Sequence, residues 1–482
     1  MVGPELHSDA LVVGAGSAGS IVAERLSFDP ACTVTVLEAG VGLADPALAA
    51  QAADATVLPI GADSRLVRRY ESELTGRPGE AARLTRGATV GGSGAVNGGY
   101  FCRGLPGDFD SGLPGWSWPE VLESFRAIET DLDFAGAQHG DSGPIPVRRS
   151  SEICAGTARF IDAAVRAGFE WLADLNDATT APQSGVGAVP LNITAAGVRT
   201  GPGAAFLVPA LDRPNLTVRT ETQAIRVEID RGRAVAVHAI GPGGPLRLSA
   251  DRIILCAGAI ESAHLLMLSG VGQPAMLRQL GIEVHSVLPV GAQCVDHPEW
   301  LVATDWPGTG GRPVLEAVLH HDDVEIRPYT SGFGTLLGES GPAEPPQIGV
   351  ALMRPRGRGR LTLVSADPRV QPRIEHRYDI EPADAAALRR GLSLVEDIVG
   401  AKGDAPPPHW STSQHLCGSA PMGADDDESA VLDARCRVRG VEALWVIDGS
   451  ALPQIPSRGP HATIAMLAHR AASLLRDQKR SR

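Results

Sequence analysis

The sequence predicts an α/β protein with two domains, one built on parallel strands and the other on antiparallel strands. The stretch 9–40 reads as a strand, a glycine turn, a helix and a second strand, and a similar unit follows at 252–268. Runs within 216–255 alternate in β-branched residues with turn residues between them, which is typical of antiparallel strands. The chain has 482 residues, more than the roughly 250–300 at which one hydrophobic core stops growing, so two domains are expected.

The glycine turn near the N-terminus carries the first chemical signal. Gly14, Gly16 and Gly19 follow a short apolar strand in G-x-G-x-x-G spacing. The first glycine permits a tight turn and the second lets the backbone approach a pyrophosphate. The third lets the helix that begins near Ser17 pack closely against the strand. The N-terminus of that helix then faces the phosphates.

A carboxylate completes this motif. The run Val34–Leu37 reads as the second strand, and Glu38 stands at its end, 19 residues past Gly19. A carboxylate at this place can accept hydrogen bonds from a ribose diol. The motif therefore predicts dinucleotide binding, and these residues alone leave NAD and FAD as equal candidates.

Apolar periodicity and capping residues predict the other elements. The segment 115–133 is an amphipathic helix with Ser117 as its N-cap and Pro119 in its first turn. Further helices are predicted at 151–168, 262–268, 383–399 and 463–475. Strands are predicted at 66–70, 216–229, 234–240, 246–255, 360–364, 373–378 and 445–447.

A second glycine-rich segment spans Arg86–Gly104. It contains seven glycines in an otherwise largely apolar stretch. So much glycine lets the backbone lie against something flat or phosphate-bearing. The alternative is an ordinary glycine-rich surface loop, which would usually carry more Ser, Asp and Lys.

The last quarter of the chain contributes two histidines and a turn. His415 lies in a turn-rich stretch, and His461 stands just before the last predicted helix. Asp448 and Gly449 follow a buried-type strand. The chain has thirteen histidines, so spacing alone does not distinguish these two from surface or core residues.

Composition excludes several classes of function. The net charge is -13 without a basic block, so no nucleic-acid partner is expected. The seven cysteines form no C-x-x-C pair and no zinc-ligand spacing, which predicts reduced thiols, a cytoplasmic location and no metal site. No apolar run reaches the length of a membrane span, and no signal-type segment is present.

Together these segments resemble the glucose-methanol-choline (GMC) family of FAD-dependent alcohol oxidoreductases. GATVGGSGAVNGGYFCRG resembles its first signature and GAIESAHLLMLSGVG its second, with Ala263 where proline is usual. VLPVGAQCVDHP, RGRLTLVSADPRVQPRIEHRY and VIDGSALP follow in the family's order. The resemblance implies a Rossmann-like FAD-binding domain (1–145, 200–300 and 430–482) and a discontinuous substrate-binding domain (146–199 and 301–429) built on an antiparallel sheet with helices.

The resemblance also implies roles for single residues. His415 falls on the catalytic histidine of the family, although Ser419 and Ala420 replace the usual threonine and cysteine nearby. His461 falls on the partner position. Val96 stands where choline oxidases carry a flavin-linking histidine, so the FAD is expected to be noncovalent. The cofactor-binding residues expected are Gly14, Gly16, Ser17, Gly19, Glu38, Arg86, Gly91, Gly92, Asn97, Gly98, Asp448 and Gly449.

The chemistry of alcohol oxidation assigns the two histidines different roles. A base near neutral pKa must remove the hydroxyl proton while hydride leaves the adjacent carbon for the flavin N5. We expect His415 to be this base and His461 to orient the hydroxyl and stabilise the developing alkoxide. The helix that begins after His461 can point its positive end at the reduced flavin.

Three segments resemble a narrower branch of the family, the mycofactocin-associated enzymes. They are GGSGAVNGGYFCRG, GWSWPEVLESFRAIETDLDF and PSRGPHATIAMLAHR. This branch implies reduced mycofactocin, a peptide-derived redox cofactor, as substrate, and electron transfer towards the respiratory chain, with docking at the inner face of the membrane left open. The alternatives are a small-alcohol or choline-type dehydrogenase or oxidase, and a flavin-binding interaction protein without turnover.

Overall fold

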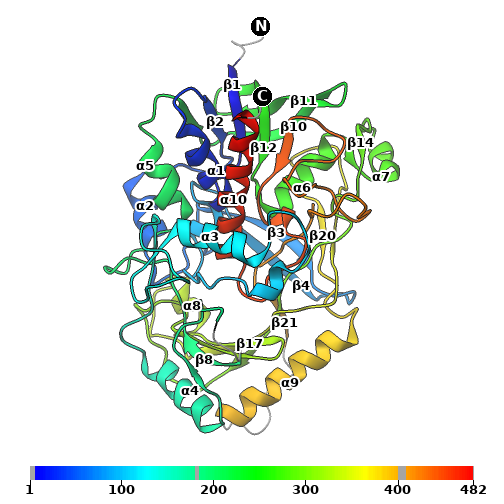
Figure 1. The fold of residues 1–482 in the computed structure, drawn as a ribbon. Helices are drawn as coiled ribbons and strands as arrows, with labels where there is room; N and C mark the ends of the chain where they lie inside the picture. The colour runs from blue at the N-terminus through cyan, green and yellow to red at the C-terminus, as the bar shows by residue number, and fades with distance from the viewer. Residues whose placement is uncertain (1–5, 180–183, 400–408, 481–482) are drawn as a thin grey trace.

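A computed structural model describes residues 6–179, 184–399 and 409–480. Two seven-stranded sheets dominate the fold, one at the top and one at the bottom of Figure 1. The mixed α/β architecture predicted from the sequence is confirmed. A smaller four-stranded sheet stands between them and contributes to the wall of the main cavity.

The upper sheet is mostly parallel and holds the largest hydrophobic core. Its spatial order is β10-β11-β12-β1-β2-β9, and β22 pairs with β12. The strands are β1 (Leu6–Val13), β2 (Val34–Leu37), β9 (Leu216–Arg219), β10 (Gln223–Asp230), β11 (Arg233–Gly241), β12 (Gly244–Leu255) and β22 (Leu444–Val446). In the centre, Leu11 of β1 lies level with Thr35 of β2 and Ile253 of β12.

This sheet corrects the prediction for the region 216–255. Only β10, β11 and the first part of β12 form the antiparallel layer that alternation predicted. The run 216–229 is two strands, and the first of them, β9, pairs in parallel with β2. The second half of β12 pairs in parallel with β1. Alternation shows which residues share a face but not which strand lies alongside, and this explains the error.

The lower sheet is antiparallel except at one edge, where β7 and β8 are parallel. Its order is β21-β15-β18-β17-β16-β8-β7. The strands are β7 (Trp171–Leu172), β8 (Gly185–Ala188), β15 (Pro298–Ala303), β16 (Ala317–His321), β17 (Val324–Pro328), β18 (Gln347–Leu352) and β21 (Trp410–Thr412). Helices α4 (Ala155–Arg166) and α9 (Pro382–Val399) pack below it and share its core (Figure 1).

The remaining elements are a four-stranded sheet, two strand pairs and eight helices of the described residues. The four-stranded sheet contains β3 (Val67–Glu73), β4 (Ala81–Gly87), β19 (Arg360–Thr362) and β20 (Arg373–Glu375). Two strand pairs are β5 (Glu129–Asp131) with β6 (Ile145–Val147), and β13 (Val271–Gly272) with β14 (Ser286–Val287). The other helices are α1 (Ser17–Ser27), α2 (Pro46–Ala53), α3 (Trp118–Ile128), α5 (Val208–Ala210), α6 (Gly258–Leu268), α7 (Pro274–Gln279), α8 (Phe333–Leu336) and α10 (His461–Arg480).

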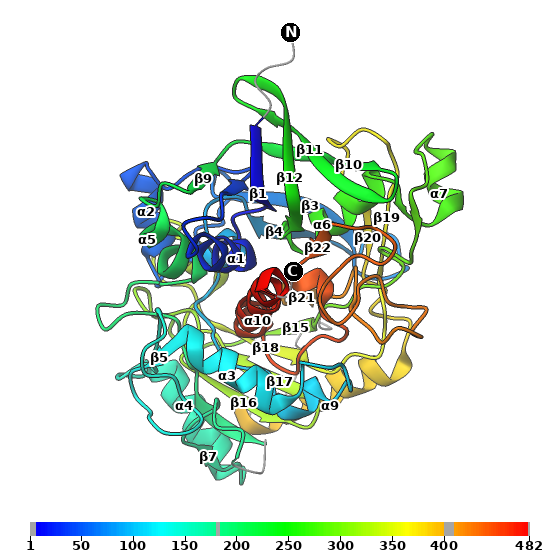
Figure 2. The same ribbon diagram turned by 45° about the horizontal axis from the view of Figure 1, so that its top comes forward.

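The packing of three helices brings the glycine turn of the nucleotide motif close to His461. Helix α10 packs beside α1 and α3 near the centre of the molecule (Figure 2). The start of α3 confirms the predicted cap, because Ser117 and Glu120 form a capping box. Since α1 follows the glycine turn and α10 begins at His461, their packing brings the nucleotide motif and this histidine to one region.

The domain boundaries stay a prediction, and residues 180–183 and 400–408 of the second domain lie outside the described residues. Within the described ranges, no helix combines the length and the apolar character needed to cross a bilayer.

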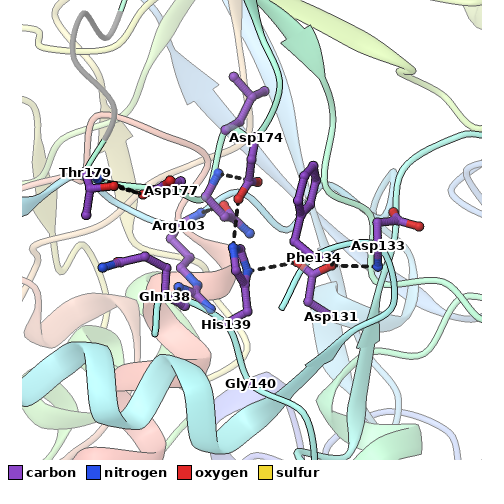
Figure 3. Close-up of polar contacts among 12 residues, drawn as sticks. Arg103, Asp131, Asp133, Phe134, Gln138, His139, Gly140, Asp174, Asp177 and Thr179 are labelled. Atoms are coloured by element: carbon purple, nitrogen blue, oxygen red, sulfur yellow. Dashed lines mark hydrogen bonds and ion pairs between the residues drawn. The ribbon is translucent and has the colours of Figure 1, made fainter. Parts of the chain in front are cut away.

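A buried ion-pair network ties the loops next to the glycine-rich segment together (Figure 3). Arg103 binds Glu129, and Arg149 binds Asp131 at 2.6 Å. His139 places Nδ1 3.1 Å from Asp131 and Nε2 2.8 Å from Asp174. A ring with a carboxylate at each nitrogen must carry both protons, so His139 is an imidazolium.

Three members of this network, Glu129, Asp131 and His139, lie close enough together to hold a metal ion. We interpret them as ion-pair partners, because both carboxylates already bind arginine and the charged imidazole has no free lone pair. Burial acts to lower the pKa of His139, but its hydrogen bonds to Asp131 and Asp174 outweigh burial and raise the pKa to about 11.

We predict that His139→Gln destabilises the protein by about 3 kcal/mol at slightly acidic pH, because it leaves buried carboxylates short of a positive partner. The pKa of His139 is higher in the folded than in the unfolded protein, so its protonation stabilises the fold fully below the unfolded value of about 6.5. This stabilisation is lost as the pH rises towards the folded value of about 11. Urea unfolding should therefore show a smaller difference from wild type at about pH 9.5 than at about pH 6. The exposed His7→Gln is the control. A deficit that stays equal at both pH values would contradict the imidazolium assignment.

Candidate active site

The glycine turn after β1 has the geometry that its spacing predicts. Gly14 has a φ of +101°, and a Cβ there would lie 2.5 Å from the carbonyl oxygen of Cys256. A Cβ on Gly19 would lie 1.8 Å from the Gly14 carbonyl oxygen, so this glycine allows α1 to pack against the turn. Around Gly16 the nearest atoms to a Cβ are 3.9 Å away, which leaves its backbone open to a ligand.

Glu38 closes the turn from the end of β2. Its Oε2 accepts a hydrogen bond from Ala15 N at 2.9 Å, and its Oε1 accepts one from Gly40 N at 2.8 Å. Burial raises the pKa of Glu38 to about 7, although both backbone donors act to lower it. A carboxylate has about four acceptor positions, so capacity remains for a ribose diol.

The glycine-rich segment lies directly against this turn. Gly91 N donates to Ala15 O at 2.8 Å, and a Cβ on Gly92 would lie 2.7 Å from the Cα of Gly16. Farther along, a Cβ on Gly98 would lie 3.2 Å from Val314 of the facing wall. The segment therefore connects the nucleotide turn with the antiparallel half of the molecule.

Asp448 holds the start of α6, the helix of the second strand–glycine–helix unit, at the cavity. Its Oδ2 accepts from Gly258 N at 2.8 Å and from Ser262 Oγ at 2.6 Å, at the start of α6. The side chain is buried, and burial raises the pKa of Asp448. Gly449 follows at the edge of the same cavity.

One cavity of about 660 Å³ connects these features with both histidines. All the predicted site residues line it except Gly19 and Gly91, which lie behind the turn and shape it through packing. Sequence reasoning missed another group of lining residues, which is Tyr100, Glu299, Arg327, Tyr329 and Gln414. For Arg327 alone a signal was available, because the buried strand β17 carries charged residues at alternate positions, which a central strand has little other reason to do.

His461 is the first residue of α10, and Asn97 fixes its protonation. The Oδ1 of Asn97 accepts from Gly99 N at 2.9 Å, so its amide nitrogen donates to His461 Nδ1 at 3.0 Å. Burial lowers the pKa of His461 to about 4, so the ring is neutral at physiological pH. Its proton therefore sits on Nε2, a buried atom without a hydrogen-bond partner among the described residues.

His415 follows β21 and is held by its backbone and its ring. Its N–H donates to Asp296 Oδ1 at 2.7 Å, and its Nδ1 lies 2.9 Å from Nδ1 of His297. Burial, followed by repulsion from His297 and nearby arginines, holds the pKa of His415 well below its usual range. The unusual Ser419 is fully buried and donates to Ala259 O at 2.5 Å, so this departure from the family pattern is accommodated.

Charged side chains on the far wall of the cavity are paired with each other. Arg327 donates to Glu325 at 2.6 Å, approaches Glu299 at 3.3 Å and donates to Ser413 at 2.8 Å. Tyr329 donates to Glu299 at 3.0 Å. This wall therefore presents polar groups without an unpaired charge.

Comparison with known proteins identifies the family. GMC oxidoreductase models match residues 8–299 and 355–468. The chain belongs to the GMC oxidoreductase family. A GMC-type oxidoreductase of Rhodococcus erythropolis is 40% identical over 495 residues, which cover 97% of this chain and 98% of that protein. An oxygen-dependent choline dehydrogenase of Vibrio vulnificus is 30% identical over 546 residues, which cover 97% and 94%.

Two solved structures have the same fold. Pyridoxine 4-oxidase from Mesorbium loti superposes with a TM-score of 0.88 at 26% identity, covering 98% of this chain and 99% of that one. Formate oxidase superposes with a TM-score of 0.87 at 22% identity, covering 99% of both chains.

Membership of the GMC family implies FAD as the cofactor, and the cavity fits it. The open backbone at Gly16 and the first turn of α1 suit a pyrophosphate, and Glu38 suits a ribose. Deeper in the cavity, Nη2 of Arg86 is buried without a partner among the described residues, and so is Nε2 of His461. Donors of this kind fit the polar edge of a flavin and an alcohol oxygen.

We predict that Glu38→Gln weakens FAD binding about 10- to 100-fold. The substitution replaces one carboxylate oxygen, a charge-assisted acceptor, by an NH2 group that faces the N–H of Ala15 or Gly40. The expected loss of binding free energy is about 1.5–3 kcal/mol. Titration of the apoprotein with FAD, followed by flavin fluorescence, measures the affinity. The exposed Glu221→Gln is the control. Unchanged affinity in Glu38→Gln would show that this carboxylate does not hold the ribose.

Proposed function

We propose that this GMC oxidoreductase is an FAD-dependent alcohol dehydrogenase with His415 as base and His461 as hydrogen-bond donor. The observation that carries the proposal is that two neutral histidines line the same cavity as the nucleotide turn. A flavin-binding protein without turnover has no evident use for such a pair.

The side chains divide the work of alcohol oxidation between them. Nε2–H of His461 donates to the substrate oxygen and stabilises its developing negative charge. His415 accepts the hydroxyl proton. The oxygen then forms the carbonyl double bond while the hydrogen on the adjacent carbon leaves with both electrons of the C–H bond, as hydride. FAD, when bound, supplies the hydride acceptor. The products are a carbonyl compound, a protonated His415 and reduced cofactor, so protons and electrons balance.

We propose reduced mycofactocin as the substrate and an acceptor leading to the respiratory chain as the electron sink. The three segments with the narrower resemblance support this choice, and they include the glycine-rich segment that lines the cavity. The cavity lining also includes the apolar side chains of Leu301, Val314, Leu315 and Phe333, which suit a substrate with an apolar body. We place this reaction in the cytoplasm, with the inner face of the membrane as the site of electron delivery.

A small alcohol is the second candidate, since relatives are named for choline and pyridoxine. The site favours an uncharged member of this class. A trimethylammonium group is best held by an unpaired carboxylate or an aromatic cage. Here the Glu299 carboxylate is occupied by Arg327, Tyr329 and Ser413.

We predict that reduced mycofactocin bleaches the oxidised flavin under anaerobic conditions faster than pyridoxine, choline or benzyl alcohol, as stopped-flow absorbance would show. His415→Ala should slow this step by roughly 10² to 10⁴ while FAD stays bound, because only the proton acceptor is lost. If no alcohol bleaches the flavin, the protein is not a dehydrogenase. If His415→Ala keeps the wild-type rate, another group is the base.

We also predict that the FAD is bound noncovalently. Val96 is buried beside the cavity and offers no nitrogen to form a bond with the flavin. Acid precipitation should release all the flavin into the supernatant, with none fluorescing on the denatured polypeptide in a gel. Yellow colour retained in the washed precipitate would refute this prediction.

A further inference from the structure

The segment Asp296-His297-Pro298 leads into β15 and lies behind the proposed base. Asp296 is buried, and its Oδ1 accepts from the backbone N–H groups of both His297, at 2.8 Å, and His415, at 2.7 Å. Its Oδ2 accepts from Tyr378 at 2.9 Å and from Thr412. One carboxylate thus fixes two chain segments that are 118 residues apart, and each carries a histidine ring.

The two rings meet through identical atoms. Nδ1 of His297 lies 2.9 Å from Nδ1 of His415, and the ring planes are 89° apart. In a hydrogen bond between these nitrogens one must carry the proton and the other must offer its lone pair. A neutral imidazole carries one proton, so a ring protonated at Nδ1 has a lone pair at Nε2, and the reverse. The direction of this hydrogen bond therefore decides whether Nε2 of His415 is an acceptor or a donor.

The role proposed for His415 decides the direction. The ring of His297 is completely buried, and burial, followed by the charge of Arg327, lowers the pKa of His297 to about 4. Its Nε2 has no hydrogen-bond partner among the described residues, so the polar contact of this ring is the one between Nδ1 and His415. A base that takes the hydroxyl proton on Nε2 must carry its own proton on Nδ1, so His415 donates and Nδ1 of His297 accepts.

We propose that His297 is a positioning residue that holds His415 in the tautomer with its proton on Nδ1, leaving Nε2 as the proton acceptor. This inference rests on the proposed role of His415 as base. It makes the two cavity histidines complementary, since Asn97 gives His461 the opposite tautomer through the same kind of contact at Nδ1. An alcohol then meets one acceptor for its proton and one donor for its oxygen.

Nitrogen NMR of the ¹⁵N-histidine-labelled holoprotein tests the tautomer directly. The signals of His415, assigned by their loss in His415→Asn, should show a protonated Nδ1 and an unprotonated Nε2 at neutral pH. His297→Leu should convert them to a mixture of tautomers. A wild-type His415 with its proton on Nε2 would overturn the proposal, and so would an unchanged spectrum in His297→Leu.

The rate of flavin reduction supplies an independent readout with the alcohol that bleaches the flavin. His297→Leu should reduce the rate constant about 10- to 100-fold, mainly without weakening substrate binding. His297→Asn places an amide oxygen near the former Nδ1 and should restore most of the rate. His376→Leu is the matched control, because His376 is buried and also lies near Asp296, at 3.6 Å.

These outcomes separate the two proposals. A wild-type rate in His415→Ala would remove the base assignment but leave the NMR tautomer as measured. A wild-type rate in His297→Leu, together with a slow His415→Ala, would overturn the positioning role alone. Equal losses in His297→Leu and His376→Leu would also overturn it, since they would show a general packing defect.

Discussion

The contact between two glycine turns sets the geometry of the whole site. Gly91 N binds Ala15 O, and the Cα of Gly16 is so close to Gly92 that a Cβ there would lie 2.7 Å from it. A side chain at Gly92 would separate the nucleotide turn from the glycine-rich segment. Beyond the contact, this segment carries Asn97 to His461 and Arg103 to the buried ion pairs. The backbone of the glycine-rich segment therefore positions the nucleotide turn, His461 and the ion-pair network relative to one another.

Buried charge is handled in two ways. Around Arg103 and His139 every charge has an opposite partner, which locks the loops behind the glycine-rich segment. On the cavity wall, Arg327 pairs with both Glu299 and Glu325, so each carboxylate has a cationic partner that keeps it in place. Isolated charges at such depth would shift to their neutral forms. The pairing therefore preserves a polar wall next to histidines that must themselves remain neutral.

Local signals in the sequence were enough for the local structure. The glycine turn and the N-cap at Ser117 depend on neighbouring residues, and both were predicted. Strand partners depend on long-range register, so the parallel pairing of β9 and of the second half of β12 was not predicted. Family resemblance, rather than pattern, selected His415 and His461 from thirteen histidines. His297 was not identified from the sequence because its partner, His415, lies 118 residues away, and no local pattern encodes that pairing.

Two chemically identical rings can take opposite roles only if their neighbours differ. Burial makes both His415 and His461 neutral, so charge does not distinguish them. What differs is the group at Nδ1, which is an amide donor for His461 and a second imidazole for His415. An amide nitrogen can only donate, whereas an imidazole nitrogen can donate or accept. The tautomer of His461 is therefore set by the amide of Asn97, while that of His415 depends on the protonation of its partner ring, His297.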